Sequence, residues 1–591
     1  MKKLIYLLLA LLILACSSDD DGNLCNYTPT LTTTEVTNIT ETGATLNGEI
    51  SIVSENCDNP NNTEQGFVYA TTIQPTTANN KVNVNGTEIS TTLENLEPNT
   101  TFYARTFLTN DLGEFYGNEV SFIISEEPID CEVVYLAENG ITIKACDDAN
   151  VGDTGVIYGV TYTVVDEAML REMVDNEEDL TKVVTTFVAD MSDMFSNAEG
   201  FNQPIGHWDV SNVTDMSSMF ENRKFINSFF NQTIGNWDVS NVIDMSYMFF
   251  RNDAFNQPIG DWDVSSVTNM EGMFFDADAF NQPIGNWDVS NVTNMFGMFR
   301  YGINFNQPIG NWDVSNVTDM YGMFFGAITF NQPIGNWDVS NVTNMFGMFV
   351  NASIFNQPIG NWDVSNVTDM YGMFNGANAF NQPIGNWDVS NVTNMFSMFS
   401  NAAAFNQPIG DWNVGNVTNM AYMFNDTTFN QPIGNWDVSN VNIIYNIFSN
   451  SYFNQPIGDW DLSSVTNISR MFYNAYNFNQ PIEDWDVSNV TDMGGMFLEA
   501  NAFNQPIGDW DVSSVTTTRQ MFESADAFNQ PIGDWNVISV TNMREMFENA
   551  STFNQDISTW SVDVVTTCYY FSDNSPLTEE NKPNFTSCDP L

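Results

Sequence analysis

Fifteen tryptophans recur at a nearly constant interval between residues 208 and 560, and this period limits the possible folds more than any other feature. The interval is 25 residues, apart from one of 29 and two of 24. Each tryptophan lies in the unit Phe-Asn-Gln-Pro-Ile-Gly-Asn-Trp-Asp-Val-Ser-Asn-Val-Thr-Asn-Met-Phe-Gly-Met-Phe, as read from Phe280, followed by five variable residues. Because a unit of this length can bury its apolar side only against its neighbours, the sequence predicts a repeat solenoid.

Two local patterns predict the secondary structure of each coil. Met295, Met298 and Phe299 stand at i, i+3 and i+4, which places them on one face of a short helical turn directed at the core. Pro283 has no N–H to donate, so a short parallel strand is expected after it, over residues 284–289. The predicted coil therefore combines one short strand with one short helical turn.

The N-terminus has the features of an export signal. Two lysines precede an apolar run of 12 residues that ends at Ala15, too short for the roughly 20 residues that a membrane-spanning helix needs. The segment Ile13-Leu14-Ala15-Cys16 resembles the lipobox of bacterial lipoproteins, which implies a signal peptide of residues 1–15 and a lipid on Cys16. An ordinary cleaved signal with a chance cysteine is the alternative.

An acidic tether follows the lipobox, over residues 16–28. Its segment Ser17-Ser18-Asp19-Asp20-Asp21 is similar to the tag that sends some lipoproteins to the outer face of the outer membrane. That similarity implies an outer-membrane lipoprotein exposed at the cell surface, with the membrane as a partner through the N-terminal lipid. A solvated tether with no sorting role explains the same charge run.

The other six cysteines form an even set, which in an exported protein predicts disulfides. Nearness in sequence favours Cys131 with Cys146 and Cys568 with Cys588, leaving Cys25 with Cys57, although fifteen pairings are possible. The sequence has no Cys-x-x-Cys pair, and we expect no metal site at these residues.

Residues 29–125 alternate short β-rich runs with polar turns, which predicts a β-sandwich ahead of the repeats. The stretches 96–105 and 116–122 resemble fibronectin type III domains of bacterial surface proteins. That resemblance implies a spacer more readily than a ligand-binding domain.

The repeated unit itself looks like that of the BspA-like leucine-rich repeat surface proteins, over residues 187–567 and about 15 coils. Residues 126–186 are similar to the lead-in of that family and are expected to cap the first coil, with residues 568–591 closing the other end. The resemblance implies a leucine-rich-repeat-like solenoid and a surface protein used in adhesion or in binding host or matrix molecules. It implies no enzymatic activity and no cofactor.

Charge and histidine content exclude several function classes. The chain has 74 acidic and 15 basic side chains, a formal net charge of −59, which repels nucleic acid phosphates. The one histidine, His207, occupies a place held by Asn or Asp in the next coils, so we interpret it as a repeat variant and expect no catalytic residues.

A column of aromatic residues is the candidate binding surface. The position after the first methionine of the unit accepts Ser, Glu, Tyr and Arg in different coils, so it is expected to contact water. Five successive coils carry an aromatic ring there, and we call this set the aromatic stripe: Phe296, Tyr321, Phe346, Tyr371 and Phe396. An exposed apolar patch indicates contact with a protein or glycan ligand. Rings that only staple the coils together, or recent duplication of the units, explain the stripe equally simply.

A second column consists of the aspartate that follows nearly every tryptophan. Asp-x-Ser spacing favours a local turn in which the carboxylate accepts the N–H two residues on, and Asn413, Asn536 and Ser561 are able to imitate it. Calcium bound between neighbouring coils is the alternative, because its ligands are oxygens.

These observations favour a non-enzymatic surface lipoprotein whose solenoid mediates adhesion. A glycan-capture protein and a structural stalk within a surface complex are the alternatives. Carboxylates are frequent enough for glycoside hydrolysis, but they recur in every coil, whereas a catalytic pair is expected to depart from the repeat.

Overall fold

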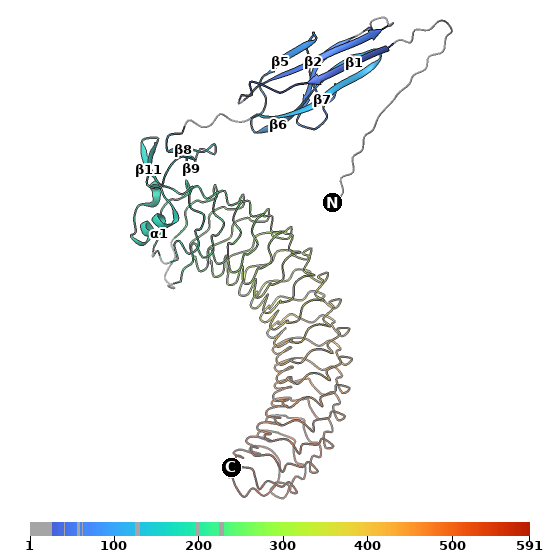
Figure 1. The fold of residues 1–591 in the computed structure, drawn as a ribbon. Coiled ribbons are helices and arrows are strands. Elements are labelled where there is room, and N and C mark those ends of the chain that lie inside the picture. The colour runs from blue at the N-terminus through green and yellow to red at the C-terminus, as the bar shows by residue number, and fades with distance from the viewer. Residues whose placement is uncertain are drawn as a thin grey trace, which may run out of the picture. The chain divides into compact units, whose positions relative to one another are not determined.

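A computed structural model describes residues 26–40, 42–55, 60–61, 63–124, 131–196, 198, 200–223 and 230–590. These form two compact units, one ending at Cys131 and the other beginning at Glu132 (Figure 1). The predicted lipidation site Cys16 and the predicted pair Cys25 and Cys57 lie outside the described residues. In the described part, no helix has the length and apolar character needed to cross a bilayer.

The N-terminal unit consists of two antiparallel sheets, with strand orders β1-β2-β5 and β4-β3-β6-β7. Alternation of apolar and polar residues puts one face of β2 in the core, at Leu46 and Ile50, opposite Phe67, Phe102 and Phe122 of the other sheet. The strands are β1 (Asn26–Thr33), β2 (Ala44–Glu55), β3 (Glu64–Ala70), β4 (Asn80–Asn83), β5 (Glu88–Leu93), β6 (Thr100–Asn110) and β7 (Gly113–Ile124).

The second unit begins with small sheets and one helix that precede the repeats. Helix α1 (Glu167–Asp175) starts where the Asp166 side chain accepts the N–H of Met169, and it buries Leu170. Strands β8 and β9 form an antiparallel hairpin, whereas β11 pairs antiparallel with β10 and parallel with β12. The remaining elements are β8 (Val134–Leu136), β9 (Ile143–Ala145), β10 (Thr154–Ile157), β11 (Val160–Val164), a 3₁₀ helix (Leu180–Lys182) and β12 (Val183–Val184).

The repeats form stacked rungs, but the predicted helical turn in each rung is wrong. The N–H of Met298 donates to the carbonyl of Met295 (3.2 Å), whereas the N–H of Phe299 donates to Met323 in the next rung (3.0 Å). Gly297, which lies between Met295 and Met298 in the sequence, has φ of 56°, in the left-handed region. The i, i+3, i+4 spacing thus comes from a β-turn with a left-handed residue, which returns apolar side chains to the core at the same spacing as a helix.

The strand predicted for residues 284–289 is also wrong. A turn forms there, because the N–H of Trp287 donates back to the carbonyl of Ile284 (3.2 Å). Parallel pairing between rungs occurs instead at isolated bridges just before each first methionine. Bridge residues are Asp190, Asp215, Asp244, Asn269, Asn294, Asp319, Asn344, Asp369, Asn394, Asn419 and Ile443, and then Asn467, Asp492, Thr517, Asn542 and Thr567. The leucine-rich-repeat-like coil of strand plus helical turn is therefore replaced by turns and single bridges.

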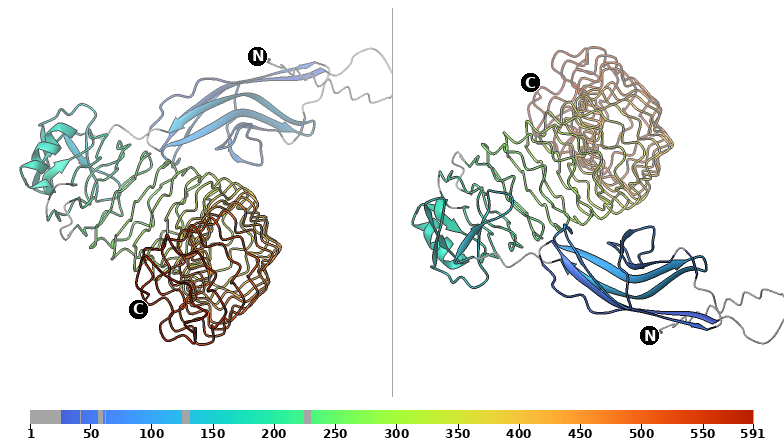
Figure 2. Two further views of the ribbon diagram at one scale, coloured as in Figure 1. Left: turned by 90° about the horizontal axis from the view of Figure 1, so that it is seen from below. Right: turned by 90° about the horizontal axis from the view of Figure 1, so that it is seen from above.

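One continuous apolar core runs through the rungs from Val165 to Leu577. Trp312 is 3% exposed, so the expectation that the tryptophans face a shared interior is confirmed. Its indole N–H donates to the carbonyl of Ile284 in the preceding rung (3.1 Å), and its ring centroid lies 6.5 Å from that of Trp287. The rungs follow a curved path, and in Figure 2 the outlines of the C-terminal rungs overlap along the line of view.

A ladder of amide side chains joins the rungs at the Asn-Gln pair of the unit. The Oδ1 atom of Asn306 accepts the backbone N–H of Asn331 and the side-chain N–H of Gln332, both at 3.0 Å. The same three-group contact recurs from rung to rung, so backbone N–H groups with no sheet partner are satisfied by side chains. This requirement explains why Asn and Gln are repeated so faithfully.

In most rungs a glycine follows the repeated isoleucine and permits a close approach between rungs, while Glu483 and Ser558 hold this position in two rungs. A Cβ atom added at Gly335 would lie 2.3 Å from the carbonyl oxygen of Pro358 in the next rung, a contact that backbone atoms cannot avoid without moving. A Cβ at Gly415 would meet nothing nearer than 3.4 Å. The first glycine therefore sets the rung spacing and the second does not.

We expect Gly335→Ala to destabilise the rung stack and Gly415→Ala to leave it unchanged or slightly more stable. The first variant should lose about 1 to 3 kcal/mol, the cost typical of overpacking, because two backbones must separate. Urea unfolding followed by tryptophan fluorescence measures both. Equal stability of the two variants would contradict this explanation of the rung spacing.

Both ends of the stack are covered. At the first rung, the N–H of Ile143 donates to the carbonyl of His207 (2.9 Å), and Lys144 lies 3.3 Å from the buried carboxylate of Asp209. At the other end, Cys568 and Cys588 form the predicted disulfide. The other predicted pair, Cys131 with Cys146, is also disulfide-bonded.

We expect Lys144→Met to cost roughly 2 to 3 kcal/mol, because it leaves the 2%-exposed Asp209 as an unpaired buried charge. Lys182→Met breaks a pair with Asp179 in which both side chains are more than half exposed, and should cost less than about 1 kcal/mol. Adding Asp209→Asn to the first variant should restore most of its stability in thermal unfolding. Equal losses from both lysines would contradict a sealing role for Lys144.

Candidate binding site

The predicted aromatic stripe exists as a column of stacked, half-buried rings. Its ring centroids are 4.3 to 4.7 Å apart, with planes within 13° of parallel. Each ring face is therefore covered by the ring of the next rung, and only the ring edges reach the surface. This geometry agrees with the stapling interpretation, and it leaves the tyrosine hydroxyls and ring edges for any partner.

Beside the stripe runs a floor of left-handed glycines. Gly297, Gly322, Gly347 and Gly372 are buried and have φ between 54° and 59°, which an L-residue adopts only at a cost. They follow directly after the stripe residues in sequence. The floor has no side chains, so neighbouring side chains pack against it, and a Cβ added at Gly322 would lie 3.4 Å from Nη1 of Arg300.

Arg300 lies against the glycine floor, among four aromatic rings. Its guanidinium carbon lies 4.3 Å from the ring centroid of Phe325 and 5.3 Å from that of Phe275. Tyr301 and Tyr321 are next, at 5.5 and 6.0 Å, and Tyr321 belongs to the stripe. Such cation–π contacts contribute about 0.5 to 1 kcal/mol each at exposed sites, so they hold the guanidinium in place without removing its charge.

We call the residues equivalent to 296, 297, 300 and 301 in each rung the turn face. The basic side chains of residues 230–567 all belong to it: Arg251, Arg300, Arg470, Arg519 and Arg544. Its chemistry changes along the stack, from the aromatic stripe and Arg300, through small polar residues near Ser397, to an acidic end near Glu523. The positions equivalent to 303 and 304 also vary, whereas the rest of the unit stays nearly constant, so rungs differ at the turn face and at the residues that follow it.

The bridge residues beside the turn face alternate in charge through the central rungs. Asn269 donates its side-chain N–H to the carboxylate of Asp244 (3.0 Å), and Asn344 donates in the same way to Asp319 (3.4 Å). An asparagine between two aspartates separates their charges by a further rung and gives one of them a donor. The alternation also matches the stripe, because Phe stands two residues after each Asn and Tyr stands two residues after each Asp.

The aspartates after the tryptophans form the local turns favoured by the sequence. The Oδ1 atom of Asp338 accepts the N–H of Ser340 at 3.1 Å, and Asn413 accepts the N–H of Gly415 in the same way at 3.2 Å. The Ser340 hydroxyl and N–H hold the pKa of Asp338 below its usual value. Among the described residues, no three carboxylates of this column come together as a cation site, and the calcium alternative gains no support.

We expect Asp338→Asn to be tolerated at pH 7, because the amide keeps the acceptor, whereas Asp338→Ala should lose about 0.5 to 1 kcal/mol. A lowered folded-state pKa means that the carboxylate's contribution is present above the ordinary aspartate pKa, near 3.9, and is lost as the pH falls through the lowered value. Below about pH 4 the difference between wild type and Asp338→Ala should therefore shrink. Urea unfolding at pH 7 and pH 3 tests this, and a constant difference would contradict it.

His207 is half-buried beside Tyr162, with ring centroids 5.8 Å apart. Burial lowers its pKa, although a hydrogen bond with the backbone of Val183 opposes the shift. Its Nε2 atom has no hydrogen-bond partner. The histidine thus lies under the cap, without a nucleophile hydrogen-bonded to that nitrogen.

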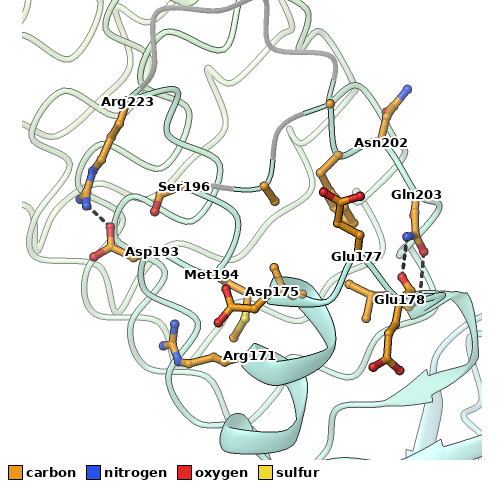
Figure 3. Close-up of a pocket in the computed structure, with 15 residues that line it drawn as sticks. Arg171, Asp175, Glu177, Glu178, Asp193, Met194, Ser196, Asn202, Gln203 and Arg223 are labelled. Carbon is orange, nitrogen blue, oxygen red and sulfur yellow. Dashed lines mark hydrogen bonds and ion pairs between the residues drawn. The ribbon is translucent and has the colours of Figure 1, made fainter.

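A hollow of about 620 Å³ lies where α1 meets the first rungs. Figure 3 shows Arg223 paired with Asp193 at one side (2.6 Å), and Gln203 at the other, where it bonds the backbone of Glu178 and Leu180. Its lining includes Ala198 and Gly200, and residues 197, 199 and 224–229 lie outside the described part. We therefore assign no site to it.

Sequence reasoning found the stripe but missed the Arg300 cluster and the acidic end of the turn face. Both lie in the variable part of the unit, and each brings together residues from different rungs. The signal was present as a concentration of arginine at these positions, but only the rung geometry shows which neighbours meet.

The stacked rungs define a tandem-repeat protein with one variable face. The chain belongs to the family described as "Mycoplasma protein of unknown function, DUF285". That family matches residues 164–229, 222–335, 282–383, 322–428, 355–452, 406–507 and 477–584. No curated protein and no solved structure matches the chain.

Proposed function

We propose that this is a non-enzymatic surface lipoprotein that binds a macromolecular partner through the turn face. The observation that carries this proposal is the concentration of rung-to-rung variation on one face, while the core, the amide ladder and the Asp turns repeat almost unchanged. A repeat protein needs such a face to give each position along the stack its own chemistry. Extended surfaces of this kind are how solenoids recognise large ligands.

The aromatic part of the turn face, centred on Arg300, is the proposed contact centre. Tyr301 is 37% exposed, and Tyr321 and the four other stripe rings present their edges beside it. Tyrosine and arginine are the residues that most often dominate protein interfaces. A charge of −59 disfavours polyanions, so the partner is a protein or a glycan without dense negative charge.

Attachment to the outer membrane through a lipid on Cys16 is part of the proposal. It is supported by the lipobox-like sequence and by the resemblance of the repeats to BspA-like surface proteins. In this arrangement the lipid retains the protein at the cell surface, and the rungs extend the range over which it contacts adhesion targets.

A structural stalk is the second candidate, and one specific observation favours it. The stripe rings cover each other's faces at 4.3 to 4.7 Å, an arrangement that stiffens the stack without any partner. A stalk requires uniform rungs, however, and does not require arginine among the aromatic rings. The Arg300 cluster therefore favours binding.

We expect wild-type protein to bind at least one member of a panel of extracellular matrix proteins and uncharged glycans. Arg300→Ser with Tyr301→Ser should weaken that binding at least about 30-fold, the size of an interface hot spot. The matched control is Asn311→Ser with Asn336→Ser, two exposed residues of the constant part of the unit. Binding is measured by surface plasmon resonance, and urea unfolding checks that both variants fold.

The outcomes separate the two candidates. Loss of binding in the turn-face variant alone supports the proposal. Lack of any binding by wild-type protein, or equal binding by both variants, contradicts it and favours the stalk.

A further inference from the structure

Three glutamates from two adjacent rungs meet at the acidic end of the turn face. Glu523 comes from one rung, and Glu545 and Glu548 come from the next. One carboxylate oxygen from each lies within 4.8 Å of the other two. Glu545 occupies the left-handed floor position held by glycine in the central rungs, with φ of 57°.

Burial makes this group different from an ordinary acidic patch. Glu545 is only 7% exposed, and its Oε2 atom is buried without a hydrogen-bond partner. The Oε2 atom of Glu523 is also buried and unpartnered. Arg544 donates to the other oxygen of Glu545, from Nε at 2.9 Å and Nη2 at 2.5 Å, and so leaves Oε2 without a donor.

Two buried carboxylate oxygens without donors are costly, because a desolvated charge needs a partner of opposite sign. The surroundings add to the cost. Burial raises the pKa of Glu523, a hydrogen bond with Gln520 opposes the shift, and the charges of Glu548, Glu545 and Glu499 add to it. Burial also raises the pKa of Glu548, with Glu545 and Asp573 adding to the shift and Arg544 opposing it. One arginine does not balance this much negative charge, so a bound cation or bound protons must.

We propose that Glu523, Glu545 and Glu548 bind one Ca²⁺ ion between the two rungs. Oxygens bound to one calcium ion at 2.3 to 2.6 Å lie no more than about 5.2 Å apart, and the three carboxylate oxygens lie within 4.8 Å of one another. Calcium also accepts irregular sets of carboxylate ligands, completed by water, whereas magnesium requires a near-ideal octahedron at shorter distances. In this site each of the three glutamates supplies one carboxylate oxygen to the ion.

This site is independent of the proposed binding function. It ties one rung to the next near the C-terminal end of the stack, where the aromatic stripe is absent. A calcium ion there serves the same purpose as the stacked rings do in the central rungs.

The full protein is freed of metal with EGTA, exchanged into chelator-free buffer, and titrated with CaCl₂ in a calorimeter. We expect one saturable site in wild type, and an affinity reduced about tenfold or more in Glu545→Gln and in Glu548→Gln, since even indirect losses at metal sites reach that size. Asp511→Asn is the matched control. It removes a carboxylate from the same rung as Glu523, in a turn that lies away from the cluster and that asparagine also forms.

Thermal unfolding gives a second measurement, in which the expected order of unfolding temperatures differs between EGTA and CaCl₂. In EGTA, Glu545→Gln and Glu548→Gln should unfold at a higher temperature than wild type, because each removes a repelling charge. In CaCl₂, wild type should gain stability and these two variants should not.

The proposal is overturned if wild type shows no saturable calcium site, if Asp511→Asn weakens binding as much as Glu545→Gln does, or if Mg²⁺ produces the same response at the same concentration. The first result would identify the cluster as protonated carboxyl groups.

Discussion

Side-chain amides that bond the backbone of the next rung are the interaction on which this structure depends. Each rung contains few regular elements, and its parallel pairing is reduced to one isolated bridge. Other backbone N–H groups donate to carbonyls of the next rung, as that of Met295 does to Asp319. Asn306 adds a side-chain acceptor for the N–H of Asn331 while also binding Gln332. The tryptophan N–H satisfies an isoleucine carbonyl in the same manner. Because every such bond crosses between rungs, no rung satisfies its backbone alone, and the stack is cooperative by construction.

This division of roles separates constant positions from variable ones. Core, amide ladder and Asp turns require particular side chains, so they repeat. The turn face, which begins after the bridge residue, bonds the next rung through backbone groups, for example Gly297 N–H to the carbonyl of Tyr321. Side chains there are free to change without loss of the stack. The same freedom permits an aromatic cluster around Arg300 in one region and buried glutamates in another.

Much of this could be predicted from the sequence, and the failures have a physical cause. The repeat, the buried tryptophans, the Asp turns and the pairing of Cys568 with Cys588 follow from period, apolarity and spacing. The helical turn did not, because Met295, Met298 and Phe299 have the same spacing in a helix and in a turn with a left-handed Gly297. Only the hydrogen-bond partner of Phe299, which lies in another rung, distinguishes the two. The glutamate cluster was equally hidden, since its members come from different rungs.

The alternation of Asn and Asp at the bridge residues shows how a chain with a charge of −59 tolerates such close packing. Like charges in adjacent rungs repel by about 0.8 kcal/mol at 5 Å in water, and a neutral residue between them halves that figure. Asn344 does more, because its amide donates to Asp319. The alternation is absent at three successive bridge residues, Asp190, Asp215 and Asp244. There the guanidinium of Arg171 lies 3.6 Å from the carboxylate of Asp190. Glu523 and Glu548 break the same rule around the buried Glu545, with Arg544 beside them, and this imbalance is what a bound cation would correct.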